Sequence, residues 1–147
     1  MSKSVSYCIL IGWAVVVVVL SAVSPNVLSD NNAFLKNFIN HEILNVLGVI
    51  LAITIASAGQ LHLTLNSIEE KHSAPNHFVK TRNGIRSASY GLVWLFFVEL
   101  VIVVIKPLLC AEGWAQSIFN GASLMVVICS VLALVSIVQA VFAIKAT

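Results

Sequence analysis

Four apolar stretches, each near the length of a membrane crossing, constrain this chain more than any other feature. They cover residues 7–24, 43–64, 87–106 and 118–144, and shorter polar connections separate them. A helix needs about 20 mostly apolar residues to cross the hydrocarbon core of a bilayer. Only 10% of the residues are charged, whereas a soluble domain carries about 25%. We therefore expect one all-α transmembrane domain, a four-helix bundle embedded in a lipid bilayer.

The connection 25–41 has two interpretations. Its apolar side chains recur at helical spacing, at Phe34, Leu35, Phe38 and Ile39. Ser29 or Asp30 could cap a short helix that begins there. Such a helix could lie at the membrane surface, or it could fold over the outer mouth of the bundle.

The second helix is expected to continue beyond its apolar part. No helix-breaking residue occurs before Ser73-Ala74-Pro75-Asn76, so a helix over 43–71 would be about 43 Å long. That length exceeds a hydrocarbon thickness of about 30 Å. We expect a hairpin at about 65–86 that stands above the membrane, with Gly84 interrupting its returning arm. Its packing would join Phe78, Val79 and Ile85 to Leu61, Leu65 and Ile68.

Basic residues are distributed unevenly about these spans. Six lie on one side and two on the other: Lys3, Lys71, Lys80, Arg82, Arg86 and Lys145 against Lys36 and Lys106. Because Lys and Arg concentrate in cytoplasmic loops, we expect both termini and the hairpin in the cytoplasm of a bacterium, with the spans in its inner membrane. Aromatic residues at both interfaces, Tyr7 and Tyr90 against Trp114 and Phe119, fit this orientation.

Glu99 is the carboxylate within the third span, seven residues before Lys106 and so about 10 Å from that end of the helix. A charge at that depth is costly, so the group should be protonated, paired or in a wet cavity. At similar depth the second and fourth spans offer Asn45, Asn120 and Ser123. Two roles stay open, a bond that fixes helix packing or assembly and an ion- or proton-handling group.

A stripe of small residues follows the second span, at Gly48, Ala52, Ala56 and Gly59. Their spacing keeps them on one helix face, and such faces let membrane helices approach closely. The contact could lie within one chain or between copies of the chain in a homo-oligomer.

A basic patch marks the predicted hairpin, formed by Lys71, Lys80, Arg82 and Arg86. The positive-inside bias and lipid headgroup contact explain it fully. A docking site for a cytosolic protein is the functional alternative. Four charges without interleaved aromatic residues argue against direct nucleic-acid binding.

Enzymatic and metal chemistry lack a motif in this sequence. The spacing of His41, His62, His72 and His77 matches no zinc pattern. The seven glycines are scattered rather than grouped in a phosphate-binding loop. The three cysteines fall in separate segments, with Cys110 in a polar connection. We expect no enzyme activity, no metal and no cofactor.

In overall plan the chain resembles the small four-helix membrane components of bacterial phage-defence operons, such as the Kiwa membrane component. The resemblance covers the topology and the hairpin with Lys80, Arg82 and Arg86. It implies a homo-oligomeric membrane sensor or anchor that recruits a cytosolic effector in antiviral defence. A pore or ion-coupled transporter using Glu99 is the alternative.

Overall fold

The computed structural model describes residues 3–72, 78–109 and 113–145, and it is all-α as predicted. Its helices are α1 (Lys3–Val23), α2 (Pro25–Leu28), α3 (Ala33–Asn37), a π-helical turn η1 (Phe38–Glu42), α4 (Ile43–His72), α5 (Val79–Leu109) and α6 (Gly113–Lys145). Four helical stretches of the described residues are long and apolar enough to cross a membrane, which confirms the multi-pass class.

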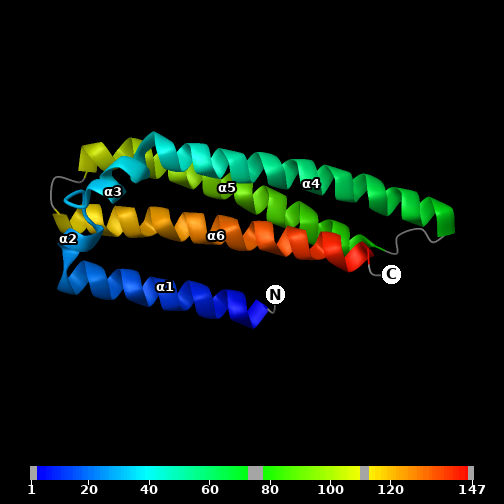
Figure 1. Cartoon of the computed structure of the whole chain (residues 1–147), viewed down its shortest axis with the longest axis horizontal. Coiled ribbons are helices and arrows are strands. Elements are labelled where there is room, and N and C mark those ends of the chain that lie inside the picture. Colours follow the sequence, from blue (N-terminus) through cyan, green and yellow to red (C-terminus); the bar gives the residue numbers. More distant parts are fainter. Residues whose placement is uncertain (1–2, 73–77, 110–112, 146–147) are drawn as a thin grey trace.

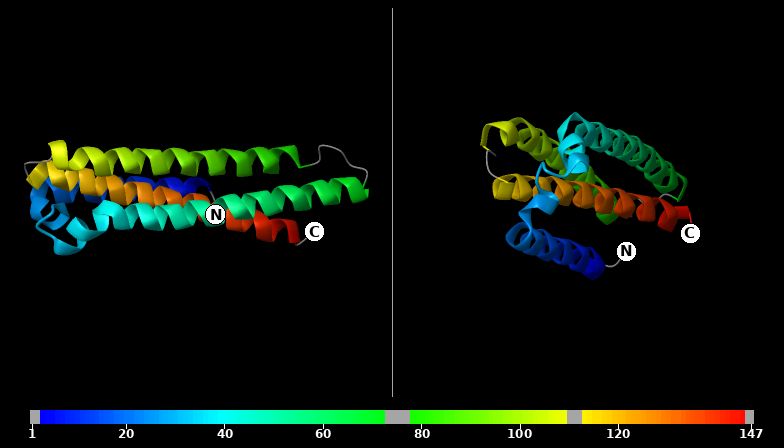
Figure 2. Two further views of the ribbon diagram at one scale, coloured as in Figure 1. Left: turned by 90° about the horizontal axis from the view of Figure 1, so that it is seen from above. Right: turned by 60° about the vertical axis from the view of Figure 1, so that its left-hand side comes forward.

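The four long helices run side by side (Figure 1). Helix α6 contacts α1, α4 and α5, whereas α1 packs mainly on α6 and the short α2. The two views in Figure 2 agree with this arrangement and show the last turns of α4 extending past the end of α6. The end of the bundle with residues 24–42 and 107–119 is called the loop end below, and the end with residues 65–86 is called the hairpin end.

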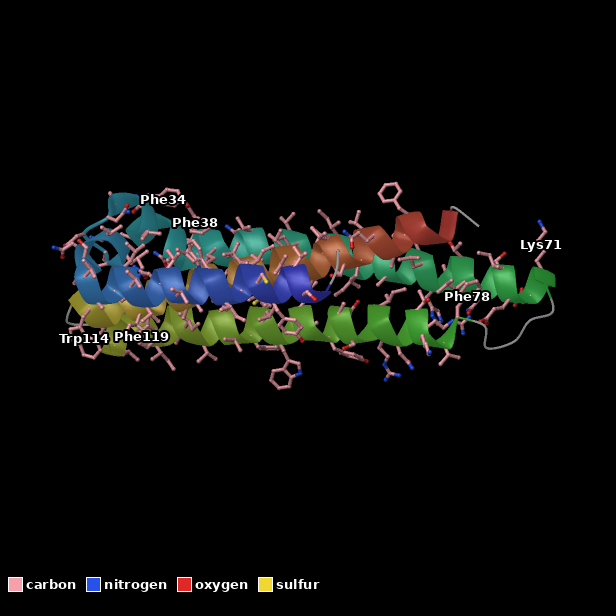
Figure 3. The ribbon with its side chains drawn as sticks, turned by 90° about the horizontal axis from the view of Figure 1, so that it is seen from below. Phe34, Phe38, Lys71, Phe78, Trp114 and Phe119 are labelled. Carbon is pink, nitrogen blue, oxygen red and sulfur yellow. The ribbon has the colours of Figure 1, made fainter. Side chains whose placement is uncertain are left out.

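The connection at the loop end folds back over the bundle, which favours the second of its two interpretations. Leu35 and Ile39 are buried and join a core cluster with Leu28, Ile43 and Val126. The exposed ring of Phe34 stacks on Phe38 on the outer side. Figure 3 shows both rings at this end, where Trp114 and Phe119 also lie.

The helix cap in this connection differs from the prediction. Neither Ser29 nor Asp30 is the cap of α3; that residue is Asn32, whose side chain accepts a hydrogen bond from the Phe34 amide at 3.1 Å. Ser29 instead ends the short α2, where its amide bonds the Pro25 carbonyl. An N-cap is the residue at which the backbone changes from extended to helical. Several consecutive residues here have side chains suited to that position, so the sequence alone did not identify which one caps the helix.

The hairpin arms are continuous helices. Helix α4 has 30 residues and α5 has 31, so Gly84 does not interrupt the returning arm. An exposed glycine costs a helix only about 1 kcal/mol, and the long helix absorbs that cost. Leu61, Leu65 and Ile85 form a second core cluster with Ile137 of α6. Phe78 packs against this cluster as predicted, whereas Val79 is exposed.

Helices α1 and α6 approach each other closely through small residues. The Ser21 and Ser117 hydroxyls are 2.8 Å apart, and one helical turn away a Cβ at Gly121 would overlap the Val17 side chain. Small residues let membrane helices come close enough for such contacts. Ser117 and Gly121 were not predicted as contact residues, although small residues four positions apart are typical of such a contact.

Candidate functional site

A polar network ties the loop end together. The Lys106 ammonium donates to the Asp30 carboxylate at 2.7 Å. The Asn120 amide donates to the Leu28 carbonyl at 2.7 Å and to the same carboxylate at 3.1 Å. The Asp30 backbone amide donates to the Gln116 side chain at 3.2 Å. The network therefore joins the connection, α5 and α6, and it satisfies polar groups that are partly or fully withdrawn from water.

Glu99 lies within the bundle rather than on its lipid face. The residue is fully buried, and neither carboxyl oxygen has a hydrogen bond within the described part of the chain. The Ser123 hydroxyl of α6 lies near this carboxyl, but it is also buried and forms no hydrogen bond within the described residues. A bond between Glu99 and the fourth span therefore remains a prediction.

The other two polar candidates at that depth are placed differently. Asn120 is fully buried but serves the loop-end network. Asn45, expected at the same depth as Glu99, is exposed on α4 and so does not face the buried carboxylate within the single chain. The inward face of α4 carries Ile43, Leu47 and Thr54. Asn45 follows Ile43 by two residues, which turns it about 200° around the helix at 100° per residue.

The small-residue stripe of α4 also faces outward. Ala52, Ala56 and Gly59 are exposed, and a Cβ at Gly48 or Gly59 would meet nothing within 4 Å. The interpretation as a contact within one chain is therefore wrong for the described residues. Larger side chains on the adjacent face, such as Leu47 and Leu61, take the inward position because they bury more apolar area.

The four basic residues of the hairpin end do not act alike. Arg82 is engaged within the chain, because its guanidinium donates to Glu69 at 2.7 Å and to Asn66 at 2.6 Å. Lys71, Lys80 and Arg86 are exposed. Figure 3 shows Lys71 near the tip of α4, at the opposite end from Trp114. Three of the four predicted docking residues thus present their charge outward.

Two residues weighed for other chemistry lie outside the described residues, His77 and Cys110. Among residues 3–72, 78–109 and 113–145, no three His, Cys, Asp or Glu side chains come close enough to hold a metal ion.

Comparison with known proteins gives no match: no family model, no curated protein and no solved structure matches this chain.

Proposed function

We propose that this protein is a non-enzymatic, homo-oligomeric membrane anchor or sensor that signals to a cytosolic protein. The proposal rests on the hairpin end. Lys71, Lys80 and Arg86 are exposed there, and the Arg82–Glu69 ion pair holds α5 against α4. A preformed helical arm with exposed charges suits recognition of an acidic surface, because the backbone of the arm does not have to be ordered on binding.

The outward stripe on α4 supports the homo-oligomeric part of the proposal. Ala52 and Ala56 are exposed, and a Cβ at Gly48 would meet nothing within 4 Å among the described residues; such surfaces suit close helix pairing in lipid. A second copy of the chain could bring its own α4 against Gly48, Ala52 and Ala56. The partner and the bacterial inner membrane, with the hairpin in the cytoplasm, belong to the same proposal. The resemblance in plan to phage-defence components supports a role in antiviral defence.

The test is native mass spectrometry of the chain extracted gently from membranes after co-expression with its genomic neighbours. We expect a homo-oligomer that carries a cytosolic protein. The variant Lys71→Glu/Lys80→Glu should release that protein, because both side chains are exposed. Lys36→Glu, exposed at the loop end, is the matched control and should retain it. Equal retention by both variants would contradict docking at the hairpin.

Burial of Glu99 supports the rival, an ion- or proton-coupled role, to a smaller degree. A carboxyl with no bonded partner among apolar helices is unusual and often functional. However, the side chain is inaccessible in the single chain, so a conduit would require the helices to separate or copies to assemble around it.

Two substitutions at Glu99 separate these roles. We expect Glu99→Gln to leave thermal stability and oligomer mass unchanged, because the amide has nearly the same size and stays polar beside Ser123. Glu99→Leu should cost about 1 kcal/mol, a usual value for one polar contact between membrane helices. Proton flux into liposomes is the second measurement. Flux that the wild type shows and Glu99→Gln abolishes would replace the anchor proposal with the transporter.

A further inference from the structure

A groove of about 550 Å³ lies between α4 and α5 near the hairpin end. Its two walls differ in chemistry. The α4 wall includes the apolar Ile55, Ala58 and Gly59, whereas the α5 wall includes Arg86, Ser89 and Tyr90. The groove therefore offers hydrocarbon contact and polar contact to one elongated molecule.

The charge of the groove is positive. Its lining contains Arg82 and Arg86 but no carboxylate. Glu69 neutralises Arg82 from outside the lining, so Arg86 supplies the unpaired charge. The Arg86 guanidinium lies 5.5 Å from the centre of the Tyr90 ring, which holds it beside the groove. An anion is the ligand that this lining favours.

Two polar atoms of the lining residues also lack partners. The Ser89 hydroxyl and the Arg82 Nε are buried, and neither makes a hydrogen bond within the described residues. A buried donor without a partner costs about 1–3 kcal/mol, so a bound oxygen that accepted from either group would remove part of that cost.

We propose that this groove binds a phospholipid with an anionic headgroup. An acyl chain would lie along Ile55 and Gly59, and the phosphate would lie against Arg86 and Ser89. The exposed Tyr90 marks the same level of the bundle, and tyrosine is enriched where membrane meets water. A phospholipid carries both an acyl chain and an anionic phosphate, so it matches the apolar and the basic residues of the groove.

The experiment titrates the detergent-solubilised full chain with phosphatidylglycerol, phosphatidylcholine or inorganic phosphate and follows bound adducts by native mass spectrometry. We expect phosphatidylglycerol to bind more tightly than phosphatidylcholine, and inorganic phosphate not to compete at equal concentration. Arg86→Gln should weaken phosphatidylglycerol binding about fivefold, the usual effect of one basic residue at an anionic lipid surface. Lys80→Gln removes the same charge outside the groove and should not weaken binding.

Gly59→Leu tests the acyl part without changing charge. A side chain at Gly59 enters open space, and so does one at Gly12 of α1, which lies outside the groove. We expect Gly59→Leu to weaken lipid binding and Gly12→Leu to leave it unchanged. Equal binding of both lipids, competition by inorganic phosphate, or equal effects of Arg86→Gln and Lys80→Gln would each overturn the proposal. Since none of these measurements involves a cytosolic protein, they stand apart from the test of partner docking.

Discussion

The two ends of the bundle each contain an ion pair at 2.7 Å, but the pairs join very different parts of the chain. At the hairpin end Arg82 bonds Asn66 and Glu69, only 16 and 13 residues away. At the loop end Asp30 bonds Lys106 and Asn120, which lie 76 and 90 residues away. The first pair fixes a local hairpin, whereas the second determines how distant helices meet.

The polar contacts of the loop end therefore determine how the helices pack, whereas the hairpin end keeps charged side chains exposed. At the loop end Asp30, Lys106 and Asn120 bond one another, so these side chains are used to hold the connection against the bundle. The hairpin end uses Arg82 internally and leaves Lys71, Lys80 and Arg86 exposed. A change at the loop end should therefore affect the whole bundle, while a change at the hairpin end should affect binding more than stability.

Asp30→Ala is expected to have the largest effect. It leaves Lys106, whose side chain is only 9% exposed, without its carboxylate. Removing one member of a buried pair costs about 3 kcal/mol or more. Thermal unfolding in detergent should show a large loss, and Asp30→Ala/Lys106→Met should recover most of it. A loss below that of Glu69→Ala would reverse the contrast between the ends.

Gly121→Leu should rank second. The added side chain would overlap Val17, and overpacking typically costs about 1–3 kcal/mol. We expect α1 to move away from α6, measurable as a lower unfolding temperature and faster proteolysis of α1. Gly91→Leu is the matched control, because a Cβ at Gly91 meets nothing within 4 Å. Similar losses for the two variants would show that the close approach of α1 and α6 is unimportant.

Glu69→Ala should cost less, about 1 kcal/mol. It removes the bonds to Arg82 and to the Phe78 amide, but Arg82 keeps Asn66 and the apolar cluster of Leu61, Leu65 and Ile85 remains. Hydrogen exchange should increase near the hairpin end and stay unchanged at the loop end. Faster exchange throughout the bundle would mean that both ends determine the architecture.

Ala52→Leu/Ala56→Leu should have the smallest effect on the single chain. Both side chains are exposed, and surface substitutions usually change stability by less than about 0.5 kcal/mol. The expected change is instead a lower oligomer mass by native mass spectrometry. An unchanged mass with an unchanged unfolding temperature would remove the stripe from the assembly.

The membrane class and the hairpin could be predicted because their signals are local. A run of about 20 apolar residues specifies a spanning helix without knowledge of its neighbours, and the periodic placement of Leu61, Leu65 and Ile85 indicates the hairpin contact. Depth along a helix can be derived by counting residues, and Glu99, Asn120 and Ser123, which were assigned similar depths, are all buried.

Which face of a helix turns inward could not be derived by counting. Asn45 and Asn120 were given similar depths, yet one is exposed and the other is buried. Most residues on every face of a membrane helix are apolar, so the usual contrast between a polar and an apolar face is weak. The Asp30–Lys106–Asn120 network was missed because no local pattern links residues so far apart.

The contact between α1 and α6 has a consequence for how the protein is made. Ser21 and Ser117 are 96 residues apart, so a ribosome adding about 5–20 residues per second takes about 5 to 20 seconds to supply the second after the first. During that interval α1 lies in the bilayer without α6, and lipid covers the face of α1 that later contacts Gly121. Helix α1 therefore docks late, when α6 displaces those lipid molecules.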